Sequence, residues 1–177
     1  MRWYWIDRFE EFVSGTRAVS IKNVSLAEEH IHGYWPGFQV MPNSLIIEGM
    51  AQTGGLLVGE KNQFVESVVL AKVSKAIFHD VVVPGDTLRY TATVADIRED
   101  GGIIQGEVHR DGELVAEVNL VFACLRGDLA EVEQFYPEEF ICMLRGLDMY
   151  RVGVTPDGDR MIPPQFMLDA EAAMATS

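Results

Sequence analysis

The chain has 177 residues, of which 48% are hydrophobic and 23% are charged. This length allows one domain with a buried core and an appendage, and the composition is typical of a globular protein. The formal net charge of −13 argues against binding to nucleic acid, because phosphates would be repelled over the whole surface. No apolar run reaches the roughly 18 residues that a membrane span needs, and the N-terminus has charges where a signal peptide is apolar. We therefore expect a cytoplasmic protein.

The two cysteines, Cys124 and Cys142, form neither a disulfide framework nor a metal-ligand pattern. We expect no metal ion and no cofactor. The acidic charge also disfavours an acidic protein partner unless a local basic patch exists. Lys72 and Lys75 are candidates for such a patch, although two ordinary solvated lysines are the plainer interpretation.

The first elements precede a loop. Ile6, Phe9 and Phe12 lie at helical spacing, which predicts a short amphipathic helix or turn. The alternating segment AVSIKNV predicts a strand over residues 18–24. The loop over residues 30–42 follows and contains two prolines and two glycines.

The segment SLIIEGMAQTGGLLVG, residues 44–59, predicts a helix that is apolar on nearly all faces and therefore buried. Pro42 followed by Asn43 or Ser44 is a credible N-terminal signal, because Asn and Ser side chains cap exposed amides. Gly54 and Gly55 lower the helix propensity but let another backbone come close. We therefore expect tight packing over this helix.

After this helix the hydrophobic pattern has a period of two, which is typical of strands. The predicted strands cover residues 67–73, 76–83, 88–94, 103–110 and 113–125. Asp111-Gly112 between the last two is a strong hairpin signal. One buried helix followed by an antiparallel meander indicates an α+β fold in which the sheet wraps around the helix.

The pattern changes again at residue 126. Pro137 opens the segment EEFICMLRGLDMY, which predicts a helix with proline in its first turn and acids beside its positive end. The last segment, residues 161–177, looks irregular. We divide the chain into a domain over residues 1–125 and a C-terminal extension over residues 126–177, which we expect to be helical and packed on the body.

Glu48 is an acid inside the apolar helix, and Gln52 shares its face one turn later. An ionised carboxylate in such a place loses hydration unless a donor or a positive charge lies nearby. The pair forms a small polar spot in an apolar surround, which is typical of a ligand-lining site. A carboxylate that satisfies a buried backbone amide, or that pairs with a residue of the other protomer in a dimer, explains the pattern equally well.

The segment PGFQVMPNSLIIEGMAQ resembles the helix-entry motif of the bacterial 3-hydroxyacyl-acyl-carrier-protein dehydratases, the FabZ/FabA family. The family pattern runs G-H-F-P-G-x-P-V-M-P-G-x-L-x-x-E-A-x-A-Q. MRWYWIDRFEEF, LAKVSKAIFHDVVVPGDTLRYTATV and GEVHRDGELVAEVNLVFACL are also similar to family segments, so the resemblance spans roughly residues 1–125. It implies a hotdog fold and a homodimer, or a higher homo-oligomer built from dimers, with sites at the protomer interface. It also implies removal of water from a 3-hydroxyacyl thioester on acyl carrier protein in fatty acid biosynthesis.

Carried over residue by residue, the resemblance places the helix acid on Glu48 and the family glutamine on Gln52. Gly37 matches the glycine of P-G, and Asn43 stands where the family has a later glycine. In the family, a histidine and the helix acid of the other protomer move protons, and amides at the helix entry polarise the thioester carbonyl. Asn tolerates the left-handed conformations that glycine visits, so the amide of Asn43 could still be well aimed.

The family histidine aligns with Tyr34. A phenol, with a pKa of about 10, is a poor base at neutral pH, whereas an imidazole near 6.5 is well suited. Tyr34 could instead donate a hydrogen bond, or act after ionisation beside a cation. His32 is the alternative base, since it lies two residues earlier and on the same side of an extended loop. His30 is interpreted as an ordinary loop histidine.

Three functions remain open. The first is a working dehydratase in which Glu48 does more of the proton transfer. The second is a catalytically impaired acyl-binding paralogue that pairs with an active subunit, and the third is a hotdog acyl thioesterase in which Glu48 activates water. The VMPN and GMAQ segments favour a dehydratase over a thioesterase. The extension packs on the body in the ordinary interpretation, and covers the acyl tunnel or alters carrier docking in the alternative.

Overall fold

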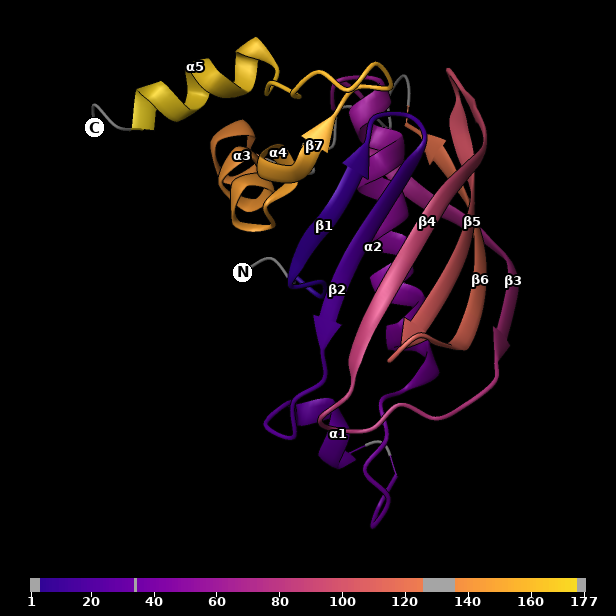
Figure 1. The fold of residues 1–177 in the computed structure, drawn as a ribbon. Helices are drawn as coiled ribbons and strands as arrows, with labels where there is room; N and C mark the ends of the chain where they lie inside the picture. The colour runs from indigo at the N-terminus through magenta and orange to yellow at the C-terminus, as the bar shows by residue number, and fades with distance from the viewer. Residues whose placement is uncertain (1–3, 34, 126–135, 175–177) are drawn as a thin grey trace.

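The structure is a computed structural model that describes residues 4–33, 35–125 and 136–174. A long helix, α2 (Asn43–Lys61), lies along a seven-stranded sheet that curves around it (Figure 1). The strand order is β3-β6-β5-β4-β2-β1-β7. Neighbouring strands are antiparallel except for β1 and β7, which are parallel. The prediction of an α+β hotdog fold with a wrapped central helix is confirmed.

The first hairpin consists of β1 (Arg8–Val13) and β2 (Arg17–Asn23). The predicted strand over residues 18–24 is confirmed, but the predicted N-terminal helix is wrong. The pairing register of β1 shifts between Phe9 and Glu11, so a bulge adds one residue to this strand. Phe9 and Phe12, three residues apart, are therefore both 0% exposed on the core side. The bulge produced helical spacing within a strand.

Helix α2 begins and ends close to the predicted bounds. The loop predicted from residue 30 is wrong at its start, where the short helix α1 (Glu29–Gly33) forms. The tight packing expected at its glycines is confirmed: a Cβ on Gly54 would lie 3.2 Å from Ile104. The closest approach is at Gly49, where a Cβ would lie only 2.3 Å from the Tyr90 ring. No helix in the described part of the chain is both long and apolar enough to cross a membrane.

The meander after α2 has four strands: β3 (Val68–Phe78), β4 (Thr87–Arg98), β5 (Gly101–Arg110) and β6 (Glu113–Cys124). The two strands predicted over 67–73 and 76–83 are one strand, which ends at Phe78. Its pairing register shifts twice, and these irregularities interrupt the alternation of apolar and polar residues that is expected along a regular strand. The Asp111-Gly112 hairpin is confirmed, with φ of +50° and +86° at its two central residues.

The C-terminal region contains α3 (Pro137–Gly146), α4 (Met149–Val152), β7 (Gly153–Val154) and α5 (Gln165–Met174). The helix predicted from Pro137 is confirmed, whereas the segment expected to be irregular forms α5 over most of its described length. β7 extends the sheet beside β1, and the Phe140 ring meets the Phe64 ring edge-on at 5.1 Å. The domain boundary at residue 125 stays a prediction, because residues 126–135 lie outside the described part.

Candidate active site

Glu48 and Gln52 lie one turn apart on α2, and both are half-buried. The Nε2 of Gln52 donates a hydrogen bond to Oε1 of Glu48 at 2.8 Å. The donor that a carboxylate needs in an apolar surround is therefore supplied by its own helix. The structure brings these two predicted site residues together.

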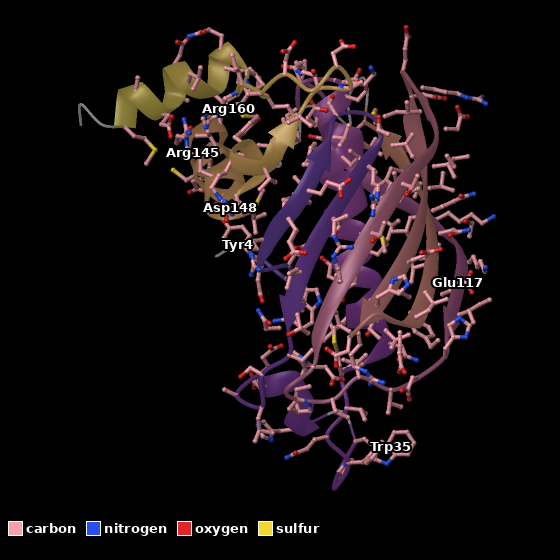
Figure 2. The ribbon with its side chains drawn as sticks, in the orientation of Figure 1. Tyr4, Trp35, Glu117, Arg145, Asp148 and Arg160 are labelled. Carbon is pink, nitrogen blue, oxygen red and sulfur yellow. The ribbon has the colours of Figure 1, made fainter. Side chains whose placement is uncertain are left out.

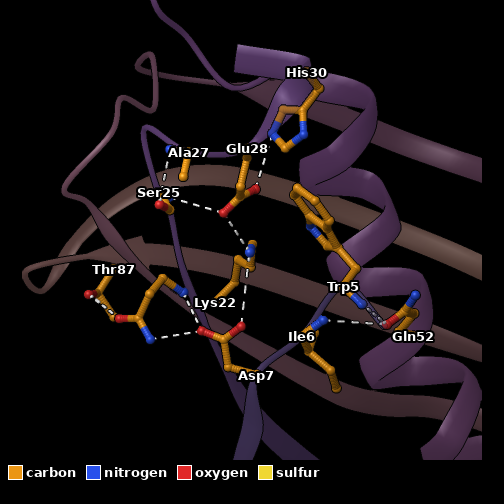
Figure 3. A network of polar contacts seen from close by, with 11 residues as sticks. Trp5, Ile6, Asp7, Lys22, Ser25, Ala27, Glu28, His30, Gln52 and Thr87 are labelled. Atoms are coloured by element: carbon orange, nitrogen blue, oxygen red, sulfur yellow. Dashed lines mark hydrogen bonds and ion pairs between the residues drawn. The ribbon is translucent and has the colours of Figure 1, made fainter. Parts of the chain in front are cut away.

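The orientation of Gln52 is set by the N-terminal segment that leads into β1. The backbone N–H groups of Trp5 and Ile6 donate to Oε1 of Gln52, at 2.8 and 3.4 Å (Figure 3). Backbone N–H groups only donate, so the amide oxygen must face them and the amide nitrogen must face Glu48. The sequence does not reveal this contact, because the partners are 47 and 46 positions apart.

Backbone hydrogen bonds hold the N-terminal end of α2, and one of them joins the residues before the helix to the loop between β3 and β4. The N–H of Met41 donates to the carbonyl of Val82 at 2.8 Å, and the N–H of Leu45 donates to the carbonyl of Pro42 at 2.9 Å. Asn43 is the first residue of the helix, Pro42 occupies the cap position and no side-chain capping hydrogen bond forms, so the predicted capping by Asn43 or Ser44 is wrong. Asn43 does not adopt the left-handed conformation that asparagine tolerates. It is exposed, and amides of a first helical turn point outward along the axis, where they suit an anionic oxygen.

Gly37 lies in a tight turn before the helix. The N–H of Phe38 donates to the carbonyl of Trp35 at 3.0 Å, and Gly37 has φ of +81° behind Pro36. Proline followed by a glycine with positive φ is the pattern of a type II turn. The turn presents Trp35, which is 60% exposed, at the opposite end of the molecule from Arg145 and Arg160 of the extension (Figure 2).

The two candidate bases differ in what the structure describes. Tyr34 lies outside the described residues. His32 is exposed, and its Nε2 lies 2.7 Å from the carbonyl oxygen of Leu26. A carbonyl only accepts, so Nε2 carries the proton of the neutral ring and Nδ1 is the atom that could act as a base. The catalytic assignment of His32 stays a prediction.

A cluster of charged groups around Trp5 was also missed. Lys22 is 8% exposed; its Nζ lies 2.9 Å from Oε1 of Glu28 and 4.5 Å from the centre of the Trp5 ring. His30, interpreted as an ordinary loop residue, has its ring centre 5.0 Å from that of Trp5 in an edge-type contact. A lysine within an otherwise buried strand was the available signal, because buried lysines require a charged partner.

This cluster lines an open hollow of about 570 Å³. Burial lowers the pKa of His30, the charge of Glu28 raises it, and the charge of Lys22 lowers it again. Within the described ranges, His, Cys, Asp and Glu side chains do not gather in groups of three or more that could hold a metal ion.

The chain matches the family model described as a FabA-like domain over residues 4–119. It is 40% identical over 119 residues to the 3-hydroxyacyl-[acyl-carrier-protein] dehydratase FabZ of Desulforamulus reducens, covering 67% of this chain and 84% of the relative. The FabZ of Thermomicrobium roseum is 39% identical over 126 residues, covering 71% of this chain and 85% of the relative.

Solved structures share the fold at lower identity. The dehydratase heterocomplex ApeI:P from Xenorhabdus doucetiae gives a TM-score of 0.60 at 17% identity, covering 71% of this chain and 86% of that one. The E. coli PaaI protein from the phenylacetic acid degradation operon gives a TM-score of 0.53 at 17% identity, covering 64% and 75%. At such identities the likeness concerns the fold alone.

Proposed function

The chain belongs to the FabA-like family of 3-hydroxyacyl-[acyl-carrier-protein] dehydratases, and on that premise we propose that it converts a 3-hydroxyacyl thioester into a trans-2-enoyl thioester and water. The observation that carries the proposal is the Glu48 carboxylate on the central helix, held by Gln52 at 2.8 Å. This is the acid that the family motif places there. The pathway would be fatty acid biosynthesis, in the cytoplasm.

The reaction needs a base for the proton at C2 and an acid for the hydroxyl at C3. We assign the base to Glu48: its carboxylate takes the C2 proton, the electron pair forms the C2–C3 double bond, and the hydroxyl leaves C3. Tyr34 donates to the departing oxygen, because a phenol is suited to donate at neutral pH. His32, acting through Nδ1, is the alternative base.

Gln52 keeps one carboxylate oxygen in place, so Oε2 is the oxygen that we assign to the substrate proton. Negative charge develops on the thioester oxygen as the C2 proton leaves, and backbone amides aimed at that oxygen stabilise it. We assign this role to the helix entry at Asn43 and to the turn at Gly37. Gly37, Asn43 and Gln52 are thus the proposed substrate-binding residues.

We propose that the site is completed by a second copy of the chain. β3 is an outer strand of the sheet, and it exposes Leu70, Val73 and Ile77, whereas the opposite edge of β1 is covered by β7. A long exposed edge with apolar side chains favours pairing with another strand. In the family that this chain resembles, the histidine loop of one protomer meets the helix acid of the other, and we propose that pairing at β3 produces the same arrangement around Glu48.

We propose acyl carrier protein as the substrate's carrier, as the names of the relatives indicate. Docking of an acidic carrier needs a local basic surface on this acidic chain. Lys72 is exposed on β3, while the Nζ of Lys75 lies 2.5 Å from Oε2 of Glu117, so its charge is largely neutralised. Lys72 is therefore the better candidate of the two.

One observation favours a second candidate function: Tyr34 stands where the family has its histidine. Losing a general base typically lowers a rate by about 10²–10⁴-fold. The chain would then be an impaired acyl-binding subunit that supports an active partner. The Tyr34→His variant separates the two functions, because gain of a reaction absent from the parent would favour the impaired subunit.

The test is incubation of the protein with a 3-hydroxyacyl thioester while the absorbance of the conjugated enoyl product is followed. We expect enoyl formation by the parent. Activity that survives Tyr34→Phe but is lost in His32→Ala would assign the base to His32. Release of thiol without enoyl product would identify a thioesterase and contradict the proposed dehydration.

A further inference from the structure

Glu28 holds two cationic or potentially cationic side chains at once (Figure 3). Its Oε1 lies 2.9 Å from the Nζ of Lys22 and also accepts the N–H of Ser25 at 3.0 Å. Its Oε2 lies 3.3 Å from the Nε2 of His30. Both of these last atoms are buried, and neither has a hydrogen bond with good geometry in the described part of the chain.

Trp5 connects this cluster to the proposed catalytic carboxylate. Trp5 is 4% exposed, with the Lys22 ammonium over its ring and the His30 ring in an edge-type contact with it. Its backbone N–H donates to Gln52, whose other end donates to Glu48. The residue whose ring packs in this cluster is therefore the same residue whose backbone N–H orients the Gln52 amide.

We propose that His30 is a positioning residue whose protonation changes the contact between Trp5 and Gln52, and through it the orientation of the Glu48 carboxylate. The effect on catalysis rests on the proposed dehydration, whereas the structural coupling does not.

The physical cause is competition for one carboxylate. A protonated His30 presents an N–H to Oε2 of Glu28, and charge-assisted bonds close to about 2.7–2.9 Å. Glu28 is then shared by two cations, which weakens its hold on Lys22. Asp7, at 3.9 Å from the Lys22 ammonium, takes up part of that charge. Protonation of His30 therefore shifts two groups that contact the Trp5 ring, the Lys22 ammonium and the His30 ring.

The remaining groups that face His30 help to set the pH at which this change occurs. Glu29 lies beside it on α1, and Tyr4 lines the same hollow from the N-terminal segment. Burial and the Lys22 charge disfavour the imidazolium, while Glu28 favours it, and burial is the largest of these effects. The pKa of His30 therefore lies below its ordinary value, and the change occurs on the acid side of neutrality.

The test uses His30→Phe, which keeps an aromatic ring against Trp5 and removes the proton. NMR follows the side-chain amide of Gln52, assigned by its absence in Gln52→Ala, from pH 8 to pH 5. We expect the amide shifts of the parent to follow the titration of the His30 ring, and this component to be absent in His30→Phe. Glu28→Gln should move the same titration to lower pH, because the charge that favours the imidazolium is lost.

Gln52 shifts that ignore the His30 titration in the parent would overturn the inference, whether or not the protein dehydrates a substrate. In an active enzyme, His30→Phe should extend the acid limb of the kcat profile to lower pH. In the Gln52→Ala background, His30→Phe should not change the kcat profile further, because the contact between Trp5 and Gln52 is already lost. An additive effect in that background would also contradict the proposal.

Discussion

Helix α2 has two carboxylates in contrasting places, Glu48 in its second turn and Glu60 in its last. Glu48 is half-buried and accepts a hydrogen bond from an amide, Gln52. Glu60 is 5% exposed, and its Oε2 accepts from the hydroxyl of Ser14 at 2.5 Å. Burial raises the pKa of Glu60, and the Ser14 hydrogen bond and the Lys61 charge lower it less.

The more deeply buried carboxylate is thus the one outside the family motif. The neighbours of Glu60 come from both parts of the chain. Ser14 follows β1 in the domain over residues 1–125, and Tyr150 lies in α4 of the extension. Burial is the main cause that raises the pKa of Tyr150, and the charge of Glu60 raises it further. A perturbed carboxylate marks a site only when its surroundings leave room for a ligand. At Glu60 the surroundings are protein, whereas Glu48 lies on a face that a single chain leaves half-exposed.

The largest expected effect separates the two carboxylates by activity. Glu48→Gln keeps an acceptor for the Gln52 amide but removes the base, so kcat for dehydration should fall by about 10²–10⁴-fold. Glu60→Gln keeps an acceptor for Ser14 and should leave kcat close to that of the parent. Steady-state rates of enoyl formation measure both. Equal losses in the two variants would refute the assignment of Glu48, and Glu113→Gln on the exposed hairpin controls for the loss of charge alone.

A glycine lies beside each carboxylate, Gly49 next to Glu48 and Gly59 next to Glu60, and substituting these glycines compares the packing of the two ends of α2. A Cβ at Gly49 would lie 2.3 Å from the fully buried ring of Tyr90, whereas a Cβ at Gly59 would lie 3.1 Å from the half-buried ring of Phe64. Overpacking of a rigid core typically costs about 1–3 kcal/mol. We expect Gly49→Ala to lower the free energy of unfolding by that amount and Gly59→Ala by less, in urea unfolding.

Gly146 provides the control for these two substitutions, because a Cβ built there has no atom of the described residues within 4 Å beyond its chain neighbours and its own helix backbone. Gly146→Ala should be neutral or slightly stabilising. If Gly59→Ala proved more destabilising than Gly49→Ala, the entry half of α2 would be the more loosely packed one, contrary to the structure.

A smaller effect concerns the pH dependence of stability at Glu60. A carboxyl whose folded-state pKa is raised binds its proton more tightly in the folded chain than in the unfolded chain. Stability from this group is therefore greatest at low pH, and decreases as pH rises through the unfolded pKa and then the folded one. Urea unfolding between pH 4 and pH 8 should show this decrease in the parent and a flatter profile in Glu60→Gln. Parallel profiles would contradict the raised pKa.

The smallest effect is expected at Tyr150. Its hydroxyl is buried without a hydrogen-bond partner among the described residues. Removing an unsatisfied buried polar group is close to neutral or stabilising, by about 0–1 kcal/mol. Tyr150→Phe should therefore keep or raise the midpoint of urea unfolding, and a clear loss of stability would show that the hydroxyl has a partner.

The sequence predicted the fold well wherever periodicity was regular. Helix α2 and the hairpin at Asp111-Gly112 were placed nearly to the residue, because each has a strong local signal. The failures share a physical cause: pairing irregularities in β1 and β3 shift the alternation, so Phe9 and Phe12 imitate a helix and β3 was divided in two. Such bulges are set by the neighbouring strand, which a local pattern does not contain.

The candidate site was predictable only along its own helix. Glu48 and Gln52 share a face at i, i+4, which spacing reveals directly. The backbone of Trp5 that orients Gln52, and His30 that packs on Trp5, reach the site by tertiary contacts. The local sequence around Trp5 and His30 does not indicate this role. A backbone N–H can donate from almost any residue type, so the identity of residue 5 does not predict the contact.

The most direct test of the central claim runs the reaction backward in heavy water. A crotonyl thioester is incubated with the parent, Glu48→Gln and Glu60→Gln in D₂O, and mass spectrometry and NMR locate the label. We predict 3-hydroxybutyryl thioester with one deuterium on C2 from the parent and Glu60→Gln, and almost none from Glu48→Gln. Free crotonic acid in place of the labelled thioester, or equal labelling by all three proteins, would contradict proton transfer by Glu48.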